Sequence, residues 1–264
     1  MKKSSISPAP SGFSLTGKVV LLTGGAGLYG RGLAAQLAAA GARLILASRN
    51  VAALEKVAEE ERSCGHTVSA HAVDQSDETS ILGLRDWVQA EFGRIDGLVN
   101  NAVARPMKTF DAPLADWEAS MKTNATGLFA LTRAIGNLMA TQGSGSIVNI
   151  GSIQGVVGPD NTLYEGLAMH AIPDYFFHKA GMVNLTRYFA AQYGPRGVRV
   201  NCVSPGGFLS GQHPTFVERY ARATFLRRMA DERDLGGPVI FLLSEAACYV
   251  TGTNLPVDGG YTAH

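Results

Sequence analysis

Short apolar runs alternate with segments of helical periodicity along almost the whole of this 264-residue chain. Such a run is typical of a buried strand, and strands separated by helices usually pair in parallel. The predicted strands cover residues 18–22, 43–47, 67–73, 95–99, 146–150, 197–203 and, with a closing turn, 253–260. This alternation predicts an α/β fold with one doubly wound, mostly seven-stranded parallel sheet flanked by helices.

No linker or internal repeat interrupts the alternation, so we predict a single domain over residues 13–264, after a flexible tail over residues 1–12. The formal net charge of +1 provides no basic field for a nucleic-acid partner. No apolar run reaches the length of about 18 residues that would indicate a membrane span. The three cysteines are scattered and lack metal-ligand spacing, which predicts reduced thiols, a cytoplasmic protein and no metal site.

The first predicted strand leads into a glycine-rich loop and then into a helix rich in alanine and leucine. The loop has the sequence Thr23-Gly24-Gly25-Ala26-Gly27-Leu28-Tyr29-Gly30. Glycines let the backbone approach a ligand, and the N-terminus of the helix presents free N–H groups to an anion. We therefore predict that a dinucleotide pyrophosphate binds at Gly24, Gly27, Leu28, Tyr29 and Gly30. A merely tight turn is the alternative.

The end of the second predicted strand bears on which dinucleotide would bind. An acidic residue there would hydrogen-bond the ribose hydroxyls of NAD, whereas this chain has Ser48 and Arg49. A hydroxyl and a planar guanidinium suit the 2′-phosphate of NADP. NADP(H) is therefore favoured, and NAD(H) remains the alternative if Arg49 is only a solvated loop residue.

Tyr175 and Lys179 lie four residues apart on a predicted long helix, and therefore on the same helical face. A nearby lysine cation favours the phenolate and lowers the pKa of the tyrosine toward neutrality. The pair could then exchange a proton with a substrate oxygen. This spacing also occurs by chance on helices, where a half-buried tyrosine beside a solvated lysine is the ordinary interpretation.

Polar motifs follow most of the other predicted strands, at the sheet edge where open α/β folds bind ligands. They are Asp74, Asn100-Asn101-Ala102, Ser152, Asn201 to Pro205-Gly206, and Val257-Asp258-Gly259-Gly260. Together with the glycine loop, Asn124, Tyr175 and Lys179, this series resembles the short-chain dehydrogenase/reductases over roughly residues 15–262. The resemblance implies a Rossmann-type catalytic domain, a nicotinamide cofactor, and interconversion of a secondary alcohol and a carbonyl. It also implies a homo-oligomer, either a tetramer or a dimer.

The resemblance further implies roles for individual residues. Tyr175 would donate and accept the proton at the substrate oxygen, Lys179 would lower its pKa and bind the nicotinamide ribose, and Ser152 would hydrogen-bond the same oxygen. Asn124 would position a water that relays protons to Lys179. The implied cofactor contacts are Asp74 at the adenine, Asn101, Ala102, Tyr175, Lys179, Pro205 and Gly206.

The chain also departs from the family pattern. Leu28 and Val103 occupy positions where the family usually has glycine, and Gly27 is expected to take over the tight turn. These departures leave open an NADP(H)-binding regulatory protein with little turnover, or a structural protein without cofactor. The segment between Ser152 and Tyr175 is longer than usual, and its extra residues, roughly 159–171, are expected beside the active site. Tyr164 within it is no substitute for Tyr175, because Ala168 follows four residues later and supplies no cation.

The extra segment and the residues after Gly207 mix polar with aromatic side chains instead of forming an apolar run. In the second region they are Gln212, His213, Phe216, Arg219, Tyr220 and Arg222. Hydrogen-bonding groups of this kind suit a substrate with several hydroxyls. We therefore predict a sugar, sugar acid or polyol as the small-molecule substrate. A reductase of hydrophobic ketones is the alternative, as is a role of these side chains in subunit contacts or a simply solvated face.

Overall fold

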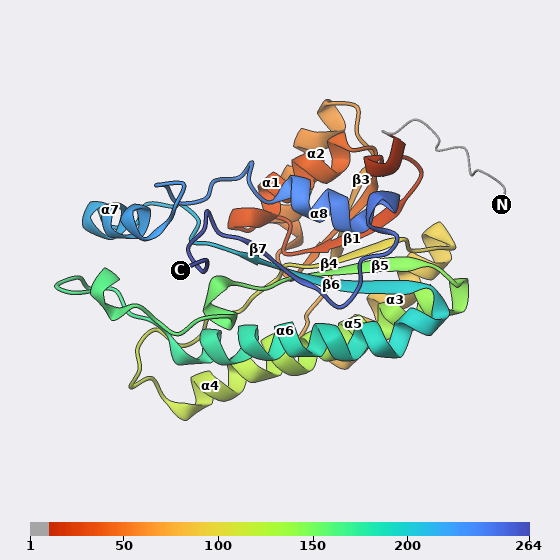
Figure 1. Cartoon of the computed structure of the whole chain (residues 1–264). Coiled ribbons are helices and arrows are strands. Elements are labelled where there is room, and N and C mark those ends of the chain that lie inside the picture. Colours follow the sequence, from red (N-terminus) through yellow and green to blue (C-terminus); the bar gives the residue numbers. More distant parts are fainter. Residues whose placement is uncertain (1–10) are drawn as a thin grey trace.

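The computed structural model describes residues 11–264, and it contains the predicted parallel sheet (Figure 1). Residues 1–10 of the predicted tail lie outside the described residues, and Ser11–Phe13 form a short 3-10 helix. All pairings between neighbouring strands are parallel. In spatial order the strands are β3 (Val68–Ala72), β2 (Arg43–Ser48), β1 (Val19–Thr23), β4 (Gly97–Asn100), β5 (Gly145–Ile150), β6 (Val198–Pro205) and β7 (Asn254–Val257).

Helices cover both faces of the sheet, as Figure 1 shows. One layer consists of α1 (Leu28–Ala39), α2 (Val51–Ser63) and α8 (Gly236–Leu243). The opposite layer consists of α3 (Glu78–Phe92), α5 (Leu128–Gln142) and α6 (Pro173–Tyr193). Two shorter helices, α4 (Leu114–Met121) and α7 (Pro214–Ala223), lie towards the carboxyl ends of the strands.

Alternate side chains of the central strand enter the two cores. Val20 and Leu22 of β1 belong to the core under α1 and α8, whereas Val19 and Leu21 belong to the core under α3, α5 and α6. Because both faces are covered, β1 has no solvated side and its sequence is a continuous apolar run.

The chain changes direction within the sheet after β3. It first adds β2 and β3 on one side of β1, and then crosses to place β4 on the other side, with Val20 paired to Gly97. The helices that follow β1 and β4 cover opposite faces of the sheet, and the carboxyl ends of such a strand pair are the position at which open α/β sheets form a ligand-binding crevice. Both the glycine loop and Asn100-Asn101-Ala102 lie at this crevice.

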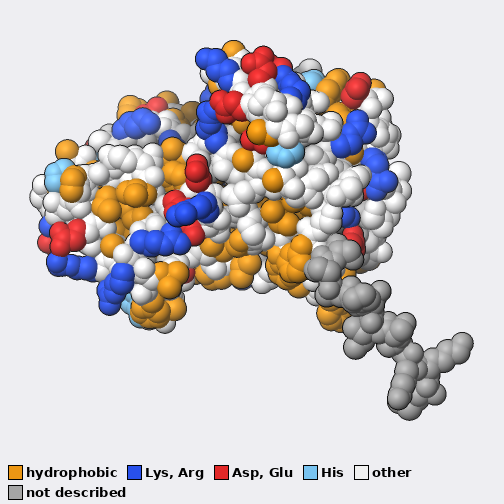
Figure 2. Space-filling view, turned by 90° about the horizontal axis from the view of Figure 1, so that it is seen from above, with side chains coloured by type: hydrophobic (Ala, Val, Ile, Leu, Met, Phe, Trp, Pro, Cys, Tyr) orange, Lys and Arg blue, Asp and Glu red, His pale blue; other side chains and the backbone are white. Residues whose placement is uncertain are grey.

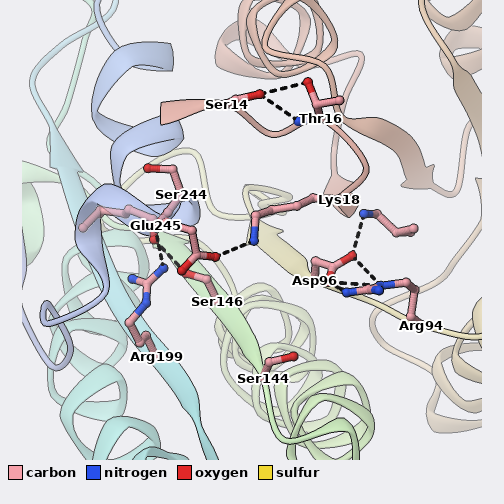
Figure 3. A network of polar contacts seen from close by, with 12 residues as sticks. Ser14, Thr16, Lys18, Arg94, Asp96, Ser144, Ser146, Arg199, Ser244 and Glu245 are labelled. Atoms are coloured by element: carbon pink, nitrogen blue, oxygen red, sulfur yellow. Dashed lines mark hydrogen bonds and ion pairs between the residues drawn. The ribbon is translucent and has the colours of Figure 1, made fainter. Parts of the chain in front are cut away.

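The opposite edge, at the amino ends of the strands, is closed by a polar network (Figure 3). The buried carboxylate of Asp96 accepts hydrogen bonds from the Val19 backbone at 2.8 Å and from Arg94 at 2.5 Å. Lys18 pairs with Glu245 at 2.7 Å. These contacts tie the start of β1 to the start of β4 and to the end of α8.

Two surface properties bear on the expected partners. Among residues 11–264 no helix is both long and apolar enough to cross a membrane. Figure 2 shows basic and acidic side chains interspersed on the face that it presents, without a continuous basic field. This mixture agrees with the formal net charge of +1.

Candidate active site

The glycine loop forms a cradle at the N-terminus of α1. Gly24 has a left-handed backbone, with φ of +68°, and a Cβ there would lie 2.9 Å from the Cα of Ala102. Gly27 has an extended backbone, with φ of −77°, so the prediction that it makes the tight turn is wrong. Gly24 makes the turn instead. The backbone N–H of Gly27 closes it by donating to the Gly24 carbonyl at 3.0 Å. Leu28 begins α1 with 60% of its surface exposed, so its side chain does not fill the cradle. No side chain caps this helix, and its free N–H groups fit a pyrophosphate.

Hydrogen bonds join the loops on the two sides of the crevice. The Thr23 hydroxyl accepts from the backbone N–H groups of Asn101 and Ala102, each at 3.0 Å. The Asn101 amide in turn donates to the carbonyls of Thr23 and Gly24. Asn101 and Ala102 thus lie directly beside the glycine cradle, where the resemblance had placed cofactor contacts.

Tyr29 connects the cradle to the turn after β6. Its hydroxyl donates to the carbonyl of Gly206 at 3.0 Å, and its ring packs edge-on against Phe208. Burial raises the pKa of Tyr29, so the side chain is a neutral hydrogen-bond donor. Pro205 and Gly206 therefore lie at the same crevice as Gly24 and Gly30.

The residues expected at the adenosine end are also neighbours. Asp74 accepts hydrogen bonds from the backbone and hydroxyl of Ser76, at 2.8 and 2.7 Å. These bonds, and then the charge of Arg49, lower the pKa of Asp74. Arg49 is exposed, and Ser48 is half-buried at the end of β2. The guanidinium is thus near Asp74 at the edge of the crevice.

Tyr175, Lys179 and Ser152 converge from α6 and from the end of β5. The Lys179 ammonium is 5.5 Å from the centre of the Tyr175 ring and donates a hydrogen bond to the carbonyl of Ile150. Ser152 begins a short 3-10 helix and caps it by accepting from the Gln154 backbone at 3.1 Å. Pro173, in the first turn of α6, fixes the start of the helix that carries both Tyr175 and Lys179.

The surroundings of Tyr175 favour its phenolate. Burial alone would raise the pKa of the tyrosine, but the cations of Lys179 and Arg105 and the nearby Ser152 hydroxyl hold it below the ordinary value. Burial lowers the pKa of Lys179, and the charge of Tyr175 opposes that effect. A tyrosine with this balance can act as acid and base at a substrate oxygen.

Asn124 lies in an irregular helical region over residues 114–142. There the chain forms α4, a π-helical segment (Lys122–Gly127) and α5, so the helix is not regular throughout. The Asn124 amide accepts from the backbone N–H of Ala104 and donates to its carbonyl, both at 2.8 Å. Such π-segments are frequent at functional sites. Here the observed contacts hold the loop after β4 against the helix.

Two residues beside Tyr175 were not predicted from the sequence. The guanidinium carbon of Arg105 is 4.4 Å from the centre of the Tyr175 ring. His178 is 3% exposed, with its ring edge-on to Tyr175 at 5.1 Å, and neither ring nitrogen has a hydrogen-bond partner. Burial, and then the cations of Lys179 and Arg105, lower the pKa of His178 to about 3, so it is neutral. The sequence signals were slight: an arginine soon after Asn-Asn-Ala, and a histidine next to Lys179.

The extra segment lies beside the start of α6, the helix that carries Tyr175 and Lys179. Its residues Pro159, Asn161 and Ala171 line a cleft of about 720 Å³ together with Trp117 and Phe177. Tyr164 instead packs against Phe216 at 5.4 Å, and burial raises its pKa. The structure therefore supports Tyr175, and not Tyr164, as the proton-transfer residue.

Several side chains expected to contact substrate have structural contacts instead. Phe216 and Tyr220 are buried in a small core with Ile153, Leu163 and Met229, so the prediction that these rings select the substrate is wrong. Arg219 donates to the carbonyl of Glu165 at 2.7 Å, which links α7 to the extra segment. Gln212 bonds to its own loop, and His213 caps α7. In Figure 1 the extra segment and α7 project from the same end of the molecule.

A glycine cradle suited to a dinucleotide, at the same sheet edge as a tyrosine–lysine pair suited to proton transfer, is characteristic of an NAD(P)-dependent oxidoreductase. Comparisons with known proteins agree with this class. A family model described as enoyl-(acyl carrier protein) reductase matches residues 27–262. The chain belongs to the short-chain dehydrogenase/reductase family.

Among its relatives are two dehydrogenases of sugar alcohols. The chain is 34% identical over 259 residues to D-threitol dehydrogenase of Mycolicibacterium smegmatis, with 95% of each chain covered. It is 33% identical over 258 residues to galactitol 2-dehydrogenase (L-tagatose-forming) of Cereibacter sphaeroides, covering 95% of this chain and 97% of the relative. A similar solved structure is gluconate 5-dehydrogenase from Burkholderia cenocepacia J2315 in complex with NADP and tartrate. It has a TM-score of 0.85 and 30% identity, with 96% of this chain and 98% of that chain covered.

Proposed function

We propose that this enzyme interconverts a secondary alcohol and a ketone on a sugar, sugar acid or polyol. The observation that carries the proposal is the position of Tyr175 between Lys179 and Ser152, at the sheet edge that also carries the glycine cradle. Three relatives are named as dehydrogenases of threitol, galactitol and gluconate, and these names support the substrate class.

The proposed roles follow from the chemistry of each side chain. When bound, the nicotinamide cofactor accepts or supplies the hydride. Tyr175 removes the hydroxyl proton during oxidation and returns it during reduction, while Lys179 stabilises the phenolate. Ser152 orients the reacting oxygen by a hydrogen bond. Asn124 fixes the β4 loop and, with Lys179, is proposed to support a proton relay.

We also propose a preference for NADP(H), because the exposed guanidinium of Arg49 can form a bidentate contact with a 2′-phosphate. A homo-oligomer assembled through α5 and α6 is supported by their exposed apolar side chains, Phe129, Phe177 and Tyr188. The free thiols of Cys64, Cys202 and Cys248 support a reducing compartment such as the cytoplasm.

Two linked measurements test the proposal. Parallel titrations with NADPH and NADH, followed by nucleotide fluorescence, should show tighter binding of NADPH. Activity assays should then detect oxidation of alditols or aldonates and little reduction of hydrophobic ketones. Activity on the hydrophobic ketones alone would contradict the substrate class. Tight cofactor binding without turnover on any of these compounds would favour the regulatory alternative.

A further inference from the structure

Arg105 places a positive charge directly at the reacting group. Its guanidinium lies over the face of the Tyr175 ring, at 4.4 Å from the ring centre, and the Lys179 ammonium is 5.5 Å from the same centre. Unlike Lys179, which is buried, Arg105 is exposed to solvent at the carboxyl edge of the sheet. A substrate whose oxygen reaches Tyr175 would therefore also lie within reach of this guanidinium.

The backbone around Arg105 is held in place. Ala104 immediately precedes Arg105. The Asn124 side chain accepts a hydrogen bond from the N–H of Ala104 and donates one to its carbonyl, each at 2.8 Å. Pro106 follows and restricts Arg105 to an extended backbone. Met107 is buried and anchors the far side of the loop. This preorganisation lowers the entropy cost of binding a ligand through the arginine.

Within the described part of the chain, no ion pair neutralises the charge of Arg105. Arg133 also stacks on an aromatic ring, but it forms an ion pair with Glu78 at 2.8 Å. Arg105 forms no ion pair with any carboxylate among residues 11–264, and the charged groups that act on Tyr175 are both cations. The adjoining His178 is neutral. No carboxylate is therefore among the charges that act on Tyr175 beside Arg105 and Lys179.

We propose that Arg105 binds a carboxylate of the substrate, so that the enzyme acts on sugar acids in preference to neutral polyols. This inference rests on the proposed function and narrows its substrate class. A carboxylate accepts two parallel hydrogen bonds from the guanidinium fork, which fixes the orientation of the sugar chain. The reacting hydroxyl is carried by the same molecule, close enough to the carboxylate to meet Tyr175.

Matched substrates provide the test. Each pair has the same carbon chain and differs in one end, a carboxylate or a CH2OH: D-gluconate with D-glucitol, D-xylonate with xylitol, and D-threonate with D-threitol. The enzymes are wild type, Arg105→Ala, Arg105→Lys and the control Arg43→Ala. Arg43 also stacks on a ring, that of Phe92 at 4.9 Å, but it lies at the amino end of β2. Kinetics are measured on the pH plateau of each variant, so that titration of Tyr175 does not contribute.

We expect wild type to prefer the acid of at least one pair. Arg105→Ala should lower kcat/KM for that acid by about 100-fold, mainly through KM, because a charge-assisted bidentate contact is lost. Arg105→Lys should recover part of this loss, since lysine keeps the charge without the fork. The matched alditol and the Arg43→Ala control should change little. Equal losses on acid and alditol, or a wild type without preference for acids, would overturn the proposal.

A binding measurement separates this inference from the proposed function. Titration of the NADP(H) complex with D-gluconate or tartrate, followed by calorimetry, requires no turnover. If these anions bind wild type and not Arg105→Ala while no compound is oxidised, the anion site stands and the proposed function fails. If they bind both proteins equally well, the carboxylate site is wrong, whatever the enzyme oxidises.

Discussion

The two edges of the central sheet use charged side chains in opposite ways. At the amino ends of the strands, Asp96 is buried with the Val19 backbone and Arg94 as partners, and Lys18 is paired with Glu245. At the carboxyl ends, Lys179 and Arg105 approach Tyr175 with no carboxylate among the charges that act on it. Charges at the amino edge are thus paired, whereas those that act on Tyr175 at the carboxyl edge are cations alone.

The two edges therefore differ in function: the amino edge stabilises the fold, and the carboxyl edge carries the groups proposed for catalysis. A paired and hydrogen-bonded charge lowers the free energy of the folded state, but it has no remaining capacity to act on a ligand. A cation without a carboxylate partner adds less to stability, but it can act on other groups. Beside a phenol it lowers the pKa of the phenol and attracts an anion. Substitutions at the two edges should therefore have separable effects on folding and on catalysis.

The largest expected effect is at the carboxyl edge. Tyr175→Phe removes the proton-transfer hydroxyl, and we expect kcat to fall by about 1000-fold. Cofactor affinity and the midpoint of thermal unfolding should change little. Tyr164→Phe is the matched control and should retain activity, because that ring packs against Phe216. Comparable losses from both substitutions would contradict the assignment of Tyr175.

The corresponding test at the amino edge is Asp96→Ala. It leaves the buried Val19 N–H without an acceptor, and we expect the free energy of unfolding in urea to fall by about 2 kcal/mol. The kcat of the folded protein should be unchanged. Asp86→Ala, which breaks the exposed pair with Arg85, should cost less than about 1 kcal/mol. A fall in kcat for Asp96→Ala without loss of stability would contradict the conclusion that the amino edge acts on folding and not on catalysis.

Arg49 offers a smaller test at the carboxyl edge. We expect Arg49→Ala to weaken NADPH binding by about tenfold, because the 2′-phosphate loses a charge-assisted contact. NADH carries no 2′-phosphate and serves as the internal control. A fluorescence titration that showed equal weakening for both nucleotides would indicate that Arg49 acts on the fold of the loop and not on the phosphate.

The smallest expected effect is a shift in pH dependence. Oxidation requires the phenolate of Tyr175, so the rate should rise with pH through a pKa below the ordinary value of a tyrosine. Lys179 and Arg105 both lower this pKa, and His178, with a pKa of about 3, stays neutral across the range. Arg105→Ala removes one cation, so the rising limb should move to higher pH. A limb that moved to lower pH, or did not move, would show that Arg105 does not act on the phenol.

Most of the fold was predictable because its signals are local. Buried strands such as β1 appear as continuous apolar runs, and α3 begins after Asp77, a residue type that favours helix N-caps. The proximity of Tyr175 and Lys179 was also predictable, since a helix places residues four apart on one face. The glycine loop was predicted, although Gly24 and not Gly27 makes its turn.

The sequence by itself determined the doubly wound sheet, the sheet edge at which the predicted site residues lie, and the helical spacing that brings Tyr175 and Lys179 together. Only the tertiary structure decided which distant side chains join them. Arg105 meets Tyr175 because Asn124 holds the β4 loop against the helix, and Phe216 and Tyr220 turn inward because the extra segment packs on α7. The physical reason is that periodicity reports on a few neighbouring residues. Contacts between loops depend on strand order and on how the whole core is packed.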